Sequence, residues 1–431
     1  MSSEWPVLPL EDCLDALIDY RGKTPEKTTS GVPLVTAKII KGGRIERPSE
    51  FIADAAYDAW MRRGIPQAGD VVLTTEAPMG EVAQLGRDRV ALAQRVVTLR
   101  GKAGLLDSTF LLYLLQTDDM QEQLRARATG TTVLGIKQSE LRKIVVPLPP
   151  IGLQRSSASV LAAVDKRIDL LRETNATLEA IAQALFKSWF VDFDPVRAKQ
   201  QGLAPAGMDE ATAALFPDSF EESALGLVPI GWRVGTLGDV SLNPRLGAKP
   251  EKIPPETPYF GLEHMPRRSI ALASAGTAEG LESGKFWFER DDVLFGKLRP
   301  YFHKVGLAPT RGVCSTDILV VRPNVPSLLG FVAMHASSDA LIAHTTMLSN
   351  GARMPRTSWQ DIAGFKVVLP PEEVAAAFNG VAYALFERIY ANIGAARALS
   401  EARDTLLPRL ISGKLRLPEA EAEAEVEARV G

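Results

Sequence analysis

The sequence predicts an α+β protein made of two tandem homologous modules that are separated by two long antiparallel coiled-coil helices, with a pseudo-two-fold relation between the halves. Three observations predict this architecture. The chain contains an internal repeat. Each copy of the repeat ends in a Pro-Pro pair that is followed by a long helical pattern, and the rest of each copy consists of short β-type runs between glycines and prolines.

The internal repeat is visible at four places along the chain. The offsets between the copies are 227, 225, 222 and 221 residues, so the order and the spacing of the motifs are shared. The matching segments are Trp5–Asp12 with Trp232–Asp239, Gly22–Pro25 with Gly247–Pro250, Gly69–Leu73 with Asp291–Phe295, and Lys143–Pro150 with Phe365–Pro371. Chance would rarely produce four matches in register, so we expect one folded module per copy.

The stretch that follows each Pro-Pro pair has a helical pattern. No proline interrupts it before Pro195 in the first copy and Pro408 in the second, and apolar residues recur at steps of three and four. A stripe sustained over about five heptads is typical of a coiled-coil pair. The stripe includes Leu171, Leu178, Leu185 and Trp189 in the first helix, and Leu385, Ile389, Leu399 and Leu406 in the second.

Two asparagines, Asn175 and Asn392, fall near these stripes. A buried asparagine in a helix seam can set the register at some cost in stability, whereas an asparagine at the edge of the stripe would be solvated. The pattern leaves both interpretations open.

These patterns predict six segments. They are a first module at 1–150, a first spacer helix at 151–194, a polar connecting segment at 195–228, a second module at 229–371, a second spacer helix at 372–413 and an acidic tail at 414–431. Within each module, runs such as Val71–Thr74 and Ile318–Val321 predict a twisted, mostly antiparallel sheet.

Charge is distributed unevenly along the chain. The formal net charge is −3, which by itself does not indicate a nucleic-acid partner. Residues 1–150 contain 19 Lys+Arg and 19 Asp+Glu, whereas residues 232–371 contain 16 and 12, and five glutamates gather at 419–427. Part of the acidity therefore lies outside the modules, and basic patches within them remain compatible with the net charge.

Several features predict a cytoplasmic chain. There is no run of eighteen apolar residues, so no membrane span is expected, and residues 1–6 lack the basic and apolar regions of a secretory signal. Cys13 and Cys314 are far apart and have no metal-ligand neighbours, so we expect two buried thiols in a reducing compartment.

A search for catalytic patterns finds none. The chain has no phosphate-binding Gly-x4-Gly-Lys-Ser/Thr motif, no His-Glu-x-x-His and no Cys-x-x-Cys, and its four histidines lack metal-ligand spacing. Asn243-Pro244-Arg245-Leu246 lacks the aromatic residue with which adenine methyltransferases stack on a flipped base, so it is interpreted as a turn. We expect no catalytic residue, no metal and no cofactor in this chain.

Polar and basic residues near glycines form clusters in both copies. Short polar side chains and flexible cations on such loops can contact phosphates and base edges, although any single lysine or arginine could equally be a solvated surface charge. The candidate DNA-binding residues are Lys23, Thr24, Thr36, Lys38, Lys41, Arg44, Thr131, Thr132 and Lys137 in the first module, and Lys297, Arg299, Tyr301, Lys304, Arg353 and Arg356 in the second.

Four motifs resemble those of the specificity subunits of type I restriction–modification systems. They are Val145–Pro150 leading into Gln154, Phe186–Pro195, Leu406–Leu415 and Gly296–Tyr301. The resemblance covers nearly the whole chain. One departure is that Pro371-Glu372-Glu373 lacks the glutamine that usually follows the second Pro-Pro pair.

The resemblance implies a function for the whole chain. In this family each module recognises one half of a split, asymmetric site in double-stranded DNA, and the antiparallel helices set the gap between the halves. Two modification subunits that methylate adenine N6 with S-adenosylmethionine, and two restriction subunits that use ATP and Mg²⁺, would be the partners. The competing interpretations are a coiled-coil scaffold with ligand-binding ends, and an enzyme that acts alone on DNA.

Overall fold

The computed structural model describes residues 5–20, 22, 24–131, 133–351 and 353–415. The chain divides into two compact units. Unit 1 comprises Met1–Arg167 and Leu399–Gly431, and unit 2 comprises Ile168–Ala398. The candidate residues Lys23 and Thr132 and most of the acidic tail lie outside the described residues.

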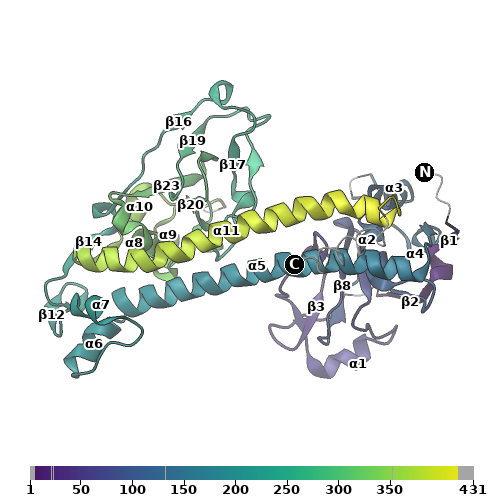
Figure 1. Ribbon diagram of the computed structural model, residues 1–431, viewed down its shortest axis with the longest axis horizontal. Coiled ribbons are helices and arrows are strands. Elements are labelled where there is room, and N and C mark those ends of the chain that lie inside the picture. Colours follow the sequence, from purple (N-terminus) through teal and green to yellow (C-terminus); the bar gives the residue numbers. More distant parts are fainter. Residues whose placement is uncertain (1–4, 21, 23, 132, 352, 416–431) are drawn as a thin grey trace, which may run out of the picture. The chain divides into compact units, whose positions relative to one another are not determined.

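Unit 1 is built around a four-stranded antiparallel sheet (Figure 1). The strand order is β2 (Leu14–Asp19), β10 (Val96–Gly101), β7 (Val71–Thr75) and β8 (Met79–Gln84). The smaller strands are β1 (Val7–Pro9), β3 (Val32–Val35), β4 (Ile40–Lys41), β5 (Arg44–Ile45), β6 (Phe51–Ile52), β9 (Ala91–Leu92) and β11 (Val145–Pro147). The short helices are α1 (Tyr57–Trp60), α2 (Ser108–Leu115), α3 (Asp118–Ala126) and α4 (Gln138–Leu141).

Unit 2 repeats this topology. Its four-stranded sheet has the order β15 (Ser241–Leu242), β23 (Ile318–Pro323), β20 (Val293–Gly296) and β21 (Val305–Leu307). A second sheet has the order β16 (Gly247–Ala248), β19 (Lys285–Phe288), β22 (Gly312–Cys314), β17 (Pro258–Phe260) and β18 (Gly276–Thr277). The remaining elements are β14 (Arg233–Thr236), β24 (Lys366–Leu369), α8 (Leu329–Ala336), α9 (Asp339–Leu348) and α10 (Trp359–Ala363).

The pairing of strands confirms the duplication. The parallel pair β3–β9 in unit 1 corresponds to the parallel pair β17–β22 in unit 2, and the terminal pair β1–β11 corresponds to β14–β24. Each terminal pair joins the first strand of a module to the strand before its Pro-Pro motif, so every module is closed on itself before its long helix begins.

The two predicted long helices are present. They are α5 (Ile151–Phe190) and α11 (Glu372–Ile411), and each contains 40 residues, which corresponds to about 60 Å. They pair antiparallel within each unit (Figure 1). In unit 1, Asp165 of α5 binds Arg403 of α11, and in unit 2, Phe186 of α5 packs against Phe378 of α11. All eight predicted stripe residues are buried or half-buried.

The asparagines of the stripe form a buried pair. The Nδ2 of Asn392 donates to Oδ1 of Asn175 at 2.8 Å, and the two side chains are 3% and 6% exposed. The interpretation as a seam residue is therefore the right one. In an apolar seam, a helix shift would leave both amides without partners, so this pair favours a single register.

The segment between the first helix and the second module is folded, although its polar composition predicted only a connection. It contains α6 (Asp194–Gln200), α7 (Glu210–Ala214) and the hairpin β12 (Phe220–Ser223)–β13 (Gly226–Pro229). Val196 and Phe216 are 0% and 2% exposed, and Phe216 packs against Trp189. A few apolar anchors in a polar segment were enough to attach it to the unit 2 core.

Two buried groups show how apolar the unit 2 core is. His335 lies edge-on to Phe186 and Phe331, and burial lowers the pKa of its imidazole to about 3. Burial raises the pKa of the Cys314 thiol to about 12, and Cys13 is buried in unit 1. The side chains of His335 and Cys314 are therefore neutral at pH 7 and act as core residues.

None of the helices in the described ranges has an apolar stretch of the length that a bilayer crossing requires.

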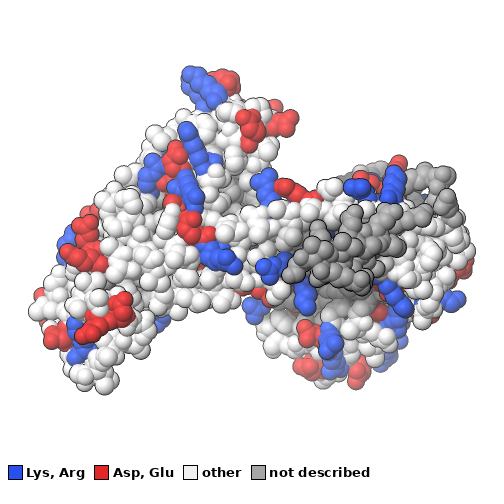
Figure 2. Space-filling model, in the orientation of Figure 1, with Lys and Arg blue, Asp and Glu red and all other residues white. Residues whose placement is uncertain are grey.

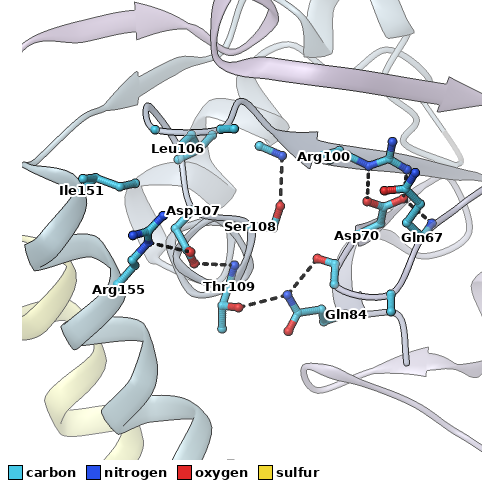
Figure 3. Close-up of a pocket in the computed structure, with 15 residues that line it drawn as sticks. Gln67, Asp70, Gln84, Arg100, Leu106, Asp107, Ser108, Thr109, Ile151 and Arg155 are labelled. Carbon is cyan, nitrogen blue, oxygen red and sulfur yellow. Dashed lines mark hydrogen bonds and ion pairs between the residues drawn. The ribbon is translucent and has the colours of Figure 1, made fainter. Parts of the chain in front are cut away.

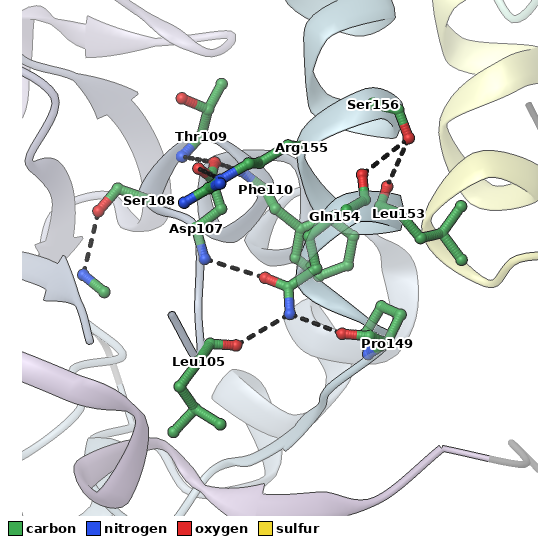
Figure 4. A network of polar contacts seen from close by, with 12 residues as sticks. Leu105, Asp107, Ser108, Thr109, Phe110, Pro149, Leu153, Gln154, Arg155 and Ser156 are labelled. Atoms are coloured by element: carbon green, nitrogen blue, oxygen red, sulfur yellow. Dashed lines mark hydrogen bonds and ion pairs between the residues drawn. The ribbon is translucent and has the colours of Figure 1, made fainter. Parts of the chain in front are cut away.

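A buried glutamine joins the first module to the start of α5 (Figure 4). Gln154 is 0% exposed, its Oε1 accepts from Asp107 N at 2.9 Å, and its Nε2 donates to Leu105 O at 2.9 Å and Pro149 O at 2.8 Å. The side chain therefore satisfies three backbone groups at the point where module, Pro-Pro motif and helix meet.

Unit 2 makes this junction with a different residue. Ala375 takes the position equivalent to Gln154, and Asn379, about one turn further along α11, accepts from Gly330 N at 2.8 Å. Gly330 lies in the first turn of α8, whose N-cap residue Leu328 provides no side-chain cap. Where the second copy lacks the glutamine, Asn379 of α11 connects the long helix to the module by capping the N-terminus of α8.

Truncating Gln154 tests whether this junction stabilises unit 1. We expect Gln154→Ala to lower the free energy of unfolding by roughly 1–3 kcal/mol, because buried backbone groups lose their partners. Urea unfolding of the full chain measures the change. Ser156→Ala, two residues along the same helix, is the matched control, because this half-buried hydroxyl bonds only carbonyls of its own helix, and equal midpoints for the two variants would contradict the assignment.

Candidate nucleic-acid interface

The structure brings all six candidate residues of the second module together on two adjoining segments. One is the hairpin loop Lys297–Lys304 between β20 and β21, and the other is the glycine turn Asn350–Arg356 before α10. Arg299 N donates to Pro355 O at 2.7 Å, and Thr357 N donates to Lys297 O at 3.0 Å. Backbone hydrogen bonds therefore hold the two segments as one surface.

The side chains of this surface differ in how they are held. Arg356 pairs with Asp317 at 3.2 Å, and Arg299 donates from Nη2 to the carbonyl of Arg353 at 3.2 Å. Tyr301 is 50% exposed. Lys304 instead points inward to the carbonyl of Leu262, and burial lowers the pKa of its ammonium. Lys304 therefore supports the loop, whereas the arginines and Tyr301 present donors and an aromatic ring at its surface.

Backbone strain is concentrated in this region. Arg268, Arg299 and His303 are non-glycine residues in the left-handed region, with φ of 54°, 52° and 52°. Such conformations cost energy, and they persist only where surrounding contacts enforce them, often at functional sites. Here Arg268 N donates to His303 O at 2.8 Å, and His303 Nε2 lies 2.9 Å from Ser337 O.

Two further arginines of the same surface are not among the residues that clustering in the sequence predicts. Arg267 lies over the ring of Phe302 with 4.0 Å between its guanidinium carbon and the ring centroid, and Arg268 pairs with Asp339 at 2.9 Å. Both are exposed. Adding the repeat offset of 225 to Gly42 and Gly43 leads to these two residues, so the repeat, unlike the clustering of cations, points to their positions.

Unit 1 has the same arrangement with different chemistry. The loop between β7 and β8 pairs through Glu76 with Gly135, and Gly135 closes a turn with Thr129. Gly130 has a φ of +116°, and a Cβ there would lie 2.2 Å from the carbonyl oxygen of Val133, so the turn requires glycine. Thr131 and Lys137 are exposed on and beside this turn.

The remaining candidates of the first module lie elsewhere on unit 1. Lys38, Lys41 and Arg44 surround the hairpin β4–β5, where Gly42 N donates to Glu81 of β8 at 2.8 Å. Thr24 is exposed and Thr36 is half-buried. The hairpin β4–β5 lies beside β8, whereas Thr131 lies on the turn that pairs with the β7–β8 loop, so both segments adjoin one strand hairpin.

Charge is mixed on the face of the chain that Figure 2 draws. On the face drawn in Figure 2, lysine and arginine side chains occur singly or in small groups among acidic ones. Such a distribution is suited to a few positioned contacts more than to uniform attraction of phosphate, which requires a continuous basic field.

A polar hollow in unit 1 has a structural explanation. It encloses about 300 Å³ beside the start of α5 and is lined by Gln67, Arg100 and Arg155 among others (Figure 3). Arg100 binds the buried Asp70 at 2.7 Å, and Arg155 lies 3.8 Å from Asp107. Arg322 and Asp292 repeat the first pair in unit 2. In the described part of the chain, no cluster of three or more potential metal ligands is present.

Several known proteins are similar to this chain in sequence. The family model for the type I restriction modification DNA specificity domain matches residues 20–180. The specificity subunit of the type I restriction enzyme MjaIX from Methanocaldococcus jannaschii is 24% identical over 96% of this chain and 94% of its own length. The specificity subunit of HindI from Haemophilus influenzae is 22% identical over 76% of this chain and 82% of its own length.

A solved structure shares the fold. The crystal structure of the type I restriction–modification S subunit from M. genitalium superposes with a TM-score of 0.55 at 16% identity, covering 95% of this chain and 96% of that one. The chain is therefore similar to type I restriction enzyme specificity subunits, through the family model over residues 20–180 and through a relative that matches 96% of the chain.

Proposed function

We propose that this chain is a type I restriction–modification specificity subunit and that it recognises a bipartite, asymmetric site in double-stranded DNA, with one half-site per module. The observation that carries the proposal is that both units present the same pair of segments on equivalent strands but with different side chains. Unit 2 offers Arg299, Tyr301 and Arg353 where unit 1 offers a short loop at Glu76 and threonines at its turn. Two modules with similar backbone segments but different hydrogen-bond donors and acceptors are suited to two different base sequences.

The physical role of each segment follows from its chemistry. Arginine can form two hydrogen bonds with guanine O6 and N7, whereas threonine contacts several bases and the methyl group of thymine. The backbone hydrogen bonds between the hairpin loop and the glycine turn would hold these groups in place before DNA arrives, which reduces the entropy lost on binding.

The chain would act within a larger cytoplasmic complex. We expect it to bind two modification subunits, which transfer a methyl group from S-adenosylmethionine to adenine N6, and two restriction subunits, which hydrolyse ATP and cut DNA with Mg²⁺. In this arrangement the chain selects the site and supplies no catalytic group. The paired helices α5 and α11 would set the gap between the half-sites and offer the docking surfaces.

Mapping N6-methylated adenines in the host genome tests the proposal. We expect one split motif whose two halves differ, because the two modules carry different surface residues. Deleting this chain should remove that methylation. Retention of a random duplex pool by the assembled complex is the independent measurement, and an absence of sequence-selective retention would instead favour a scaffold that binds other ligands.

Neutralising cations on the hairpin loop should affect one half-site only. We expect Lys297→Gln or Arg299→Gln to reduce discrimination in the half recognised by unit 2 by about 5- to 100-fold, the amount associated with a good base contact. Competition binding with duplexes altered in either half measures the effect. Lys366→Gln, an exposed cation on β24, is the matched control, and an equal loss in both halves would contradict one module per half-site.

Lengthening both helices should change the gap without changing the half-sites. Inserting seven residues after Arg172 in α5 and seven after Ala395 in α11 preserves the apolar stripe and the antiparallel pairing. Seven helical residues add about 10 Å, which corresponds to roughly three base pairs. Genome methylation mapping with this variant measures the new gap, and an unchanged gap would show that the helices do not set it.

A further inference from the structure

A carboxylate on the first long helix is buried against the second module. Glu179 of α5 is 5% exposed, its Oε2 accepts from the hydroxyl of Ser269 at 2.9 Å, and its Oε1 accepts from Ile270 N at 2.8 Å. All three residues belong to unit 2. The contact therefore joins the helix to one short segment of the module, Arg267–Leu272.

Burying the Glu179 carboxyl group would be energetically unfavourable if the side chain only packed against its neighbours. Burial raises the pKa of the Glu179 carboxyl, and no lysine, arginine or histidine of the described residues forms an ion pair with it. Burying a carboxyl group is unfavourable unless hydrogen bonds compensate, and an apolar side chain of similar size is often as stable or more stable in such a place. Two directed hydrogen bonds fix a segment in position, which an apolar contact does less well.

The segment that Glu179 holds leads directly to the candidate interface. Ile270 is 3% exposed, and its carbonyl accepts from Leu307 N of β21 at 2.9 Å. Two residues before it, Arg268 adopts its left-handed conformation and donates from its backbone to His303 O at 2.8 Å. Arg267 lies over the ring of Phe302. The segment therefore connects α5 to the hairpin loop Lys297–Lys304.

We propose that Glu179 is a positioning residue for DNA recognition by unit 2. By binding Ser269 and Ile270, it fixes where Arg267 and Arg268 are presented, and through Phe302 and His303 it fixes the hairpin loop. This inference rests on the proposed function. It adds that a spacer-helix side chain away from the exposed surface contributes to base selection in one half-site.

The repeat does not duplicate this carboxylate. At the offset of 221 residues, the equivalent position of α11 is Ser400, whose hydroxyl accepts from Arg403 at 3.4 Å. In unit 1, α5 instead contacts the module through Asp165, which accepts from the hydroxyl of Tyr113 at 2.7 Å. We therefore expect changes at Glu179 to act on the half-site of unit 2 and not on that of unit 1.

Variants at two positions test this role in the assembled complex. Glu179→Ala removes both acceptors, and Ser269→Ala removes one donor from the module side. Glu179→Gln is the conservative variant, because its Oε1 can still accept from Ile270 N while its Nε2 donates to the Ser269 hydroxyl. Glu173→Ala, an exposed carboxylate on the same helix, is the matched control.

Discrimination between matched and singly altered duplexes is the main readout, and the Lys297→Gln variant identifies which half belongs to unit 2. We expect Glu179→Ala to lose about tenfold or more in that half and to keep the other half unchanged, with near wild-type values for Glu179→Gln. Hydrogen exchange of residues 266–272 in the full chain should accelerate for Glu179→Ala and Ser269→Ala only.

The outcomes separate this inference from the proposed function. If the wild-type complex shows no sequence selectivity, the proposed function fails. If the wild type is selective, while Glu179→Ala discriminates like Glu173→Ala or loses both halves equally, the positioning role is overturned. Faster exchange at 266–272 without a change in discrimination likewise overturns it, because the contact would then be structural only.

Discussion

The antiparallel pairing of α5 with α11 is the interaction on which both compact units depend. Each unit consists of one module, the beginning of the helix that follows it and the end of the helix from the other repeat. In unit 2, the end of α5 places Phe190 against Trp232 at the start of the second module. In unit 1, Trp5 lies against Gly413 just after α11, where a Cβ would come within 2.3 Å of the indole ring.

This arrangement explains why a duplicated chain forms two interdependent units. Neither module covers its apolar surface with residues of its own repeat alone. The long helix of the other repeat covers part of the apolar faces of its strands and short helices. Burial of this apolar surface stabilises the pairing, and the Asn175–Asn392 hydrogen bond favours one register within it. A shift of register would move Glu179 away from Ser269 and Phe186 away from Phe378. Helix pairing and loop placement are therefore coupled.

The candidate interface has the same backbone frame in both units, a strand hairpin paired with a glycine turn, but different side chains. In both units a strand hairpin and a glycine turn pair through backbone hydrogen bonds, which do not depend on side-chain identity. Side chains on this frame can change while the fold stays the same, since exposed loop positions contribute little to the core. Under the proposed function, stability would depend on the sheet and helices, whereas recognition would depend on surface residues such as Arg299 and Thr131.

Repetition and periodicity in the sequence determined the two modules, the two long helices and the stripe residues from Leu171 to Leu406, because apolar spacing encodes which helix face is buried. Composition was misleading for 195–228, where Val196 and Phe216 attach a polar segment to the core. Only the tertiary structure brought Arg267 and Arg268 to the hairpin loop, turned Lys304 inward and placed Glu179 on Ser269. These contacts join residues up to 91 positions apart, as between Glu179 and Ile270, and no local pattern encodes such a distance.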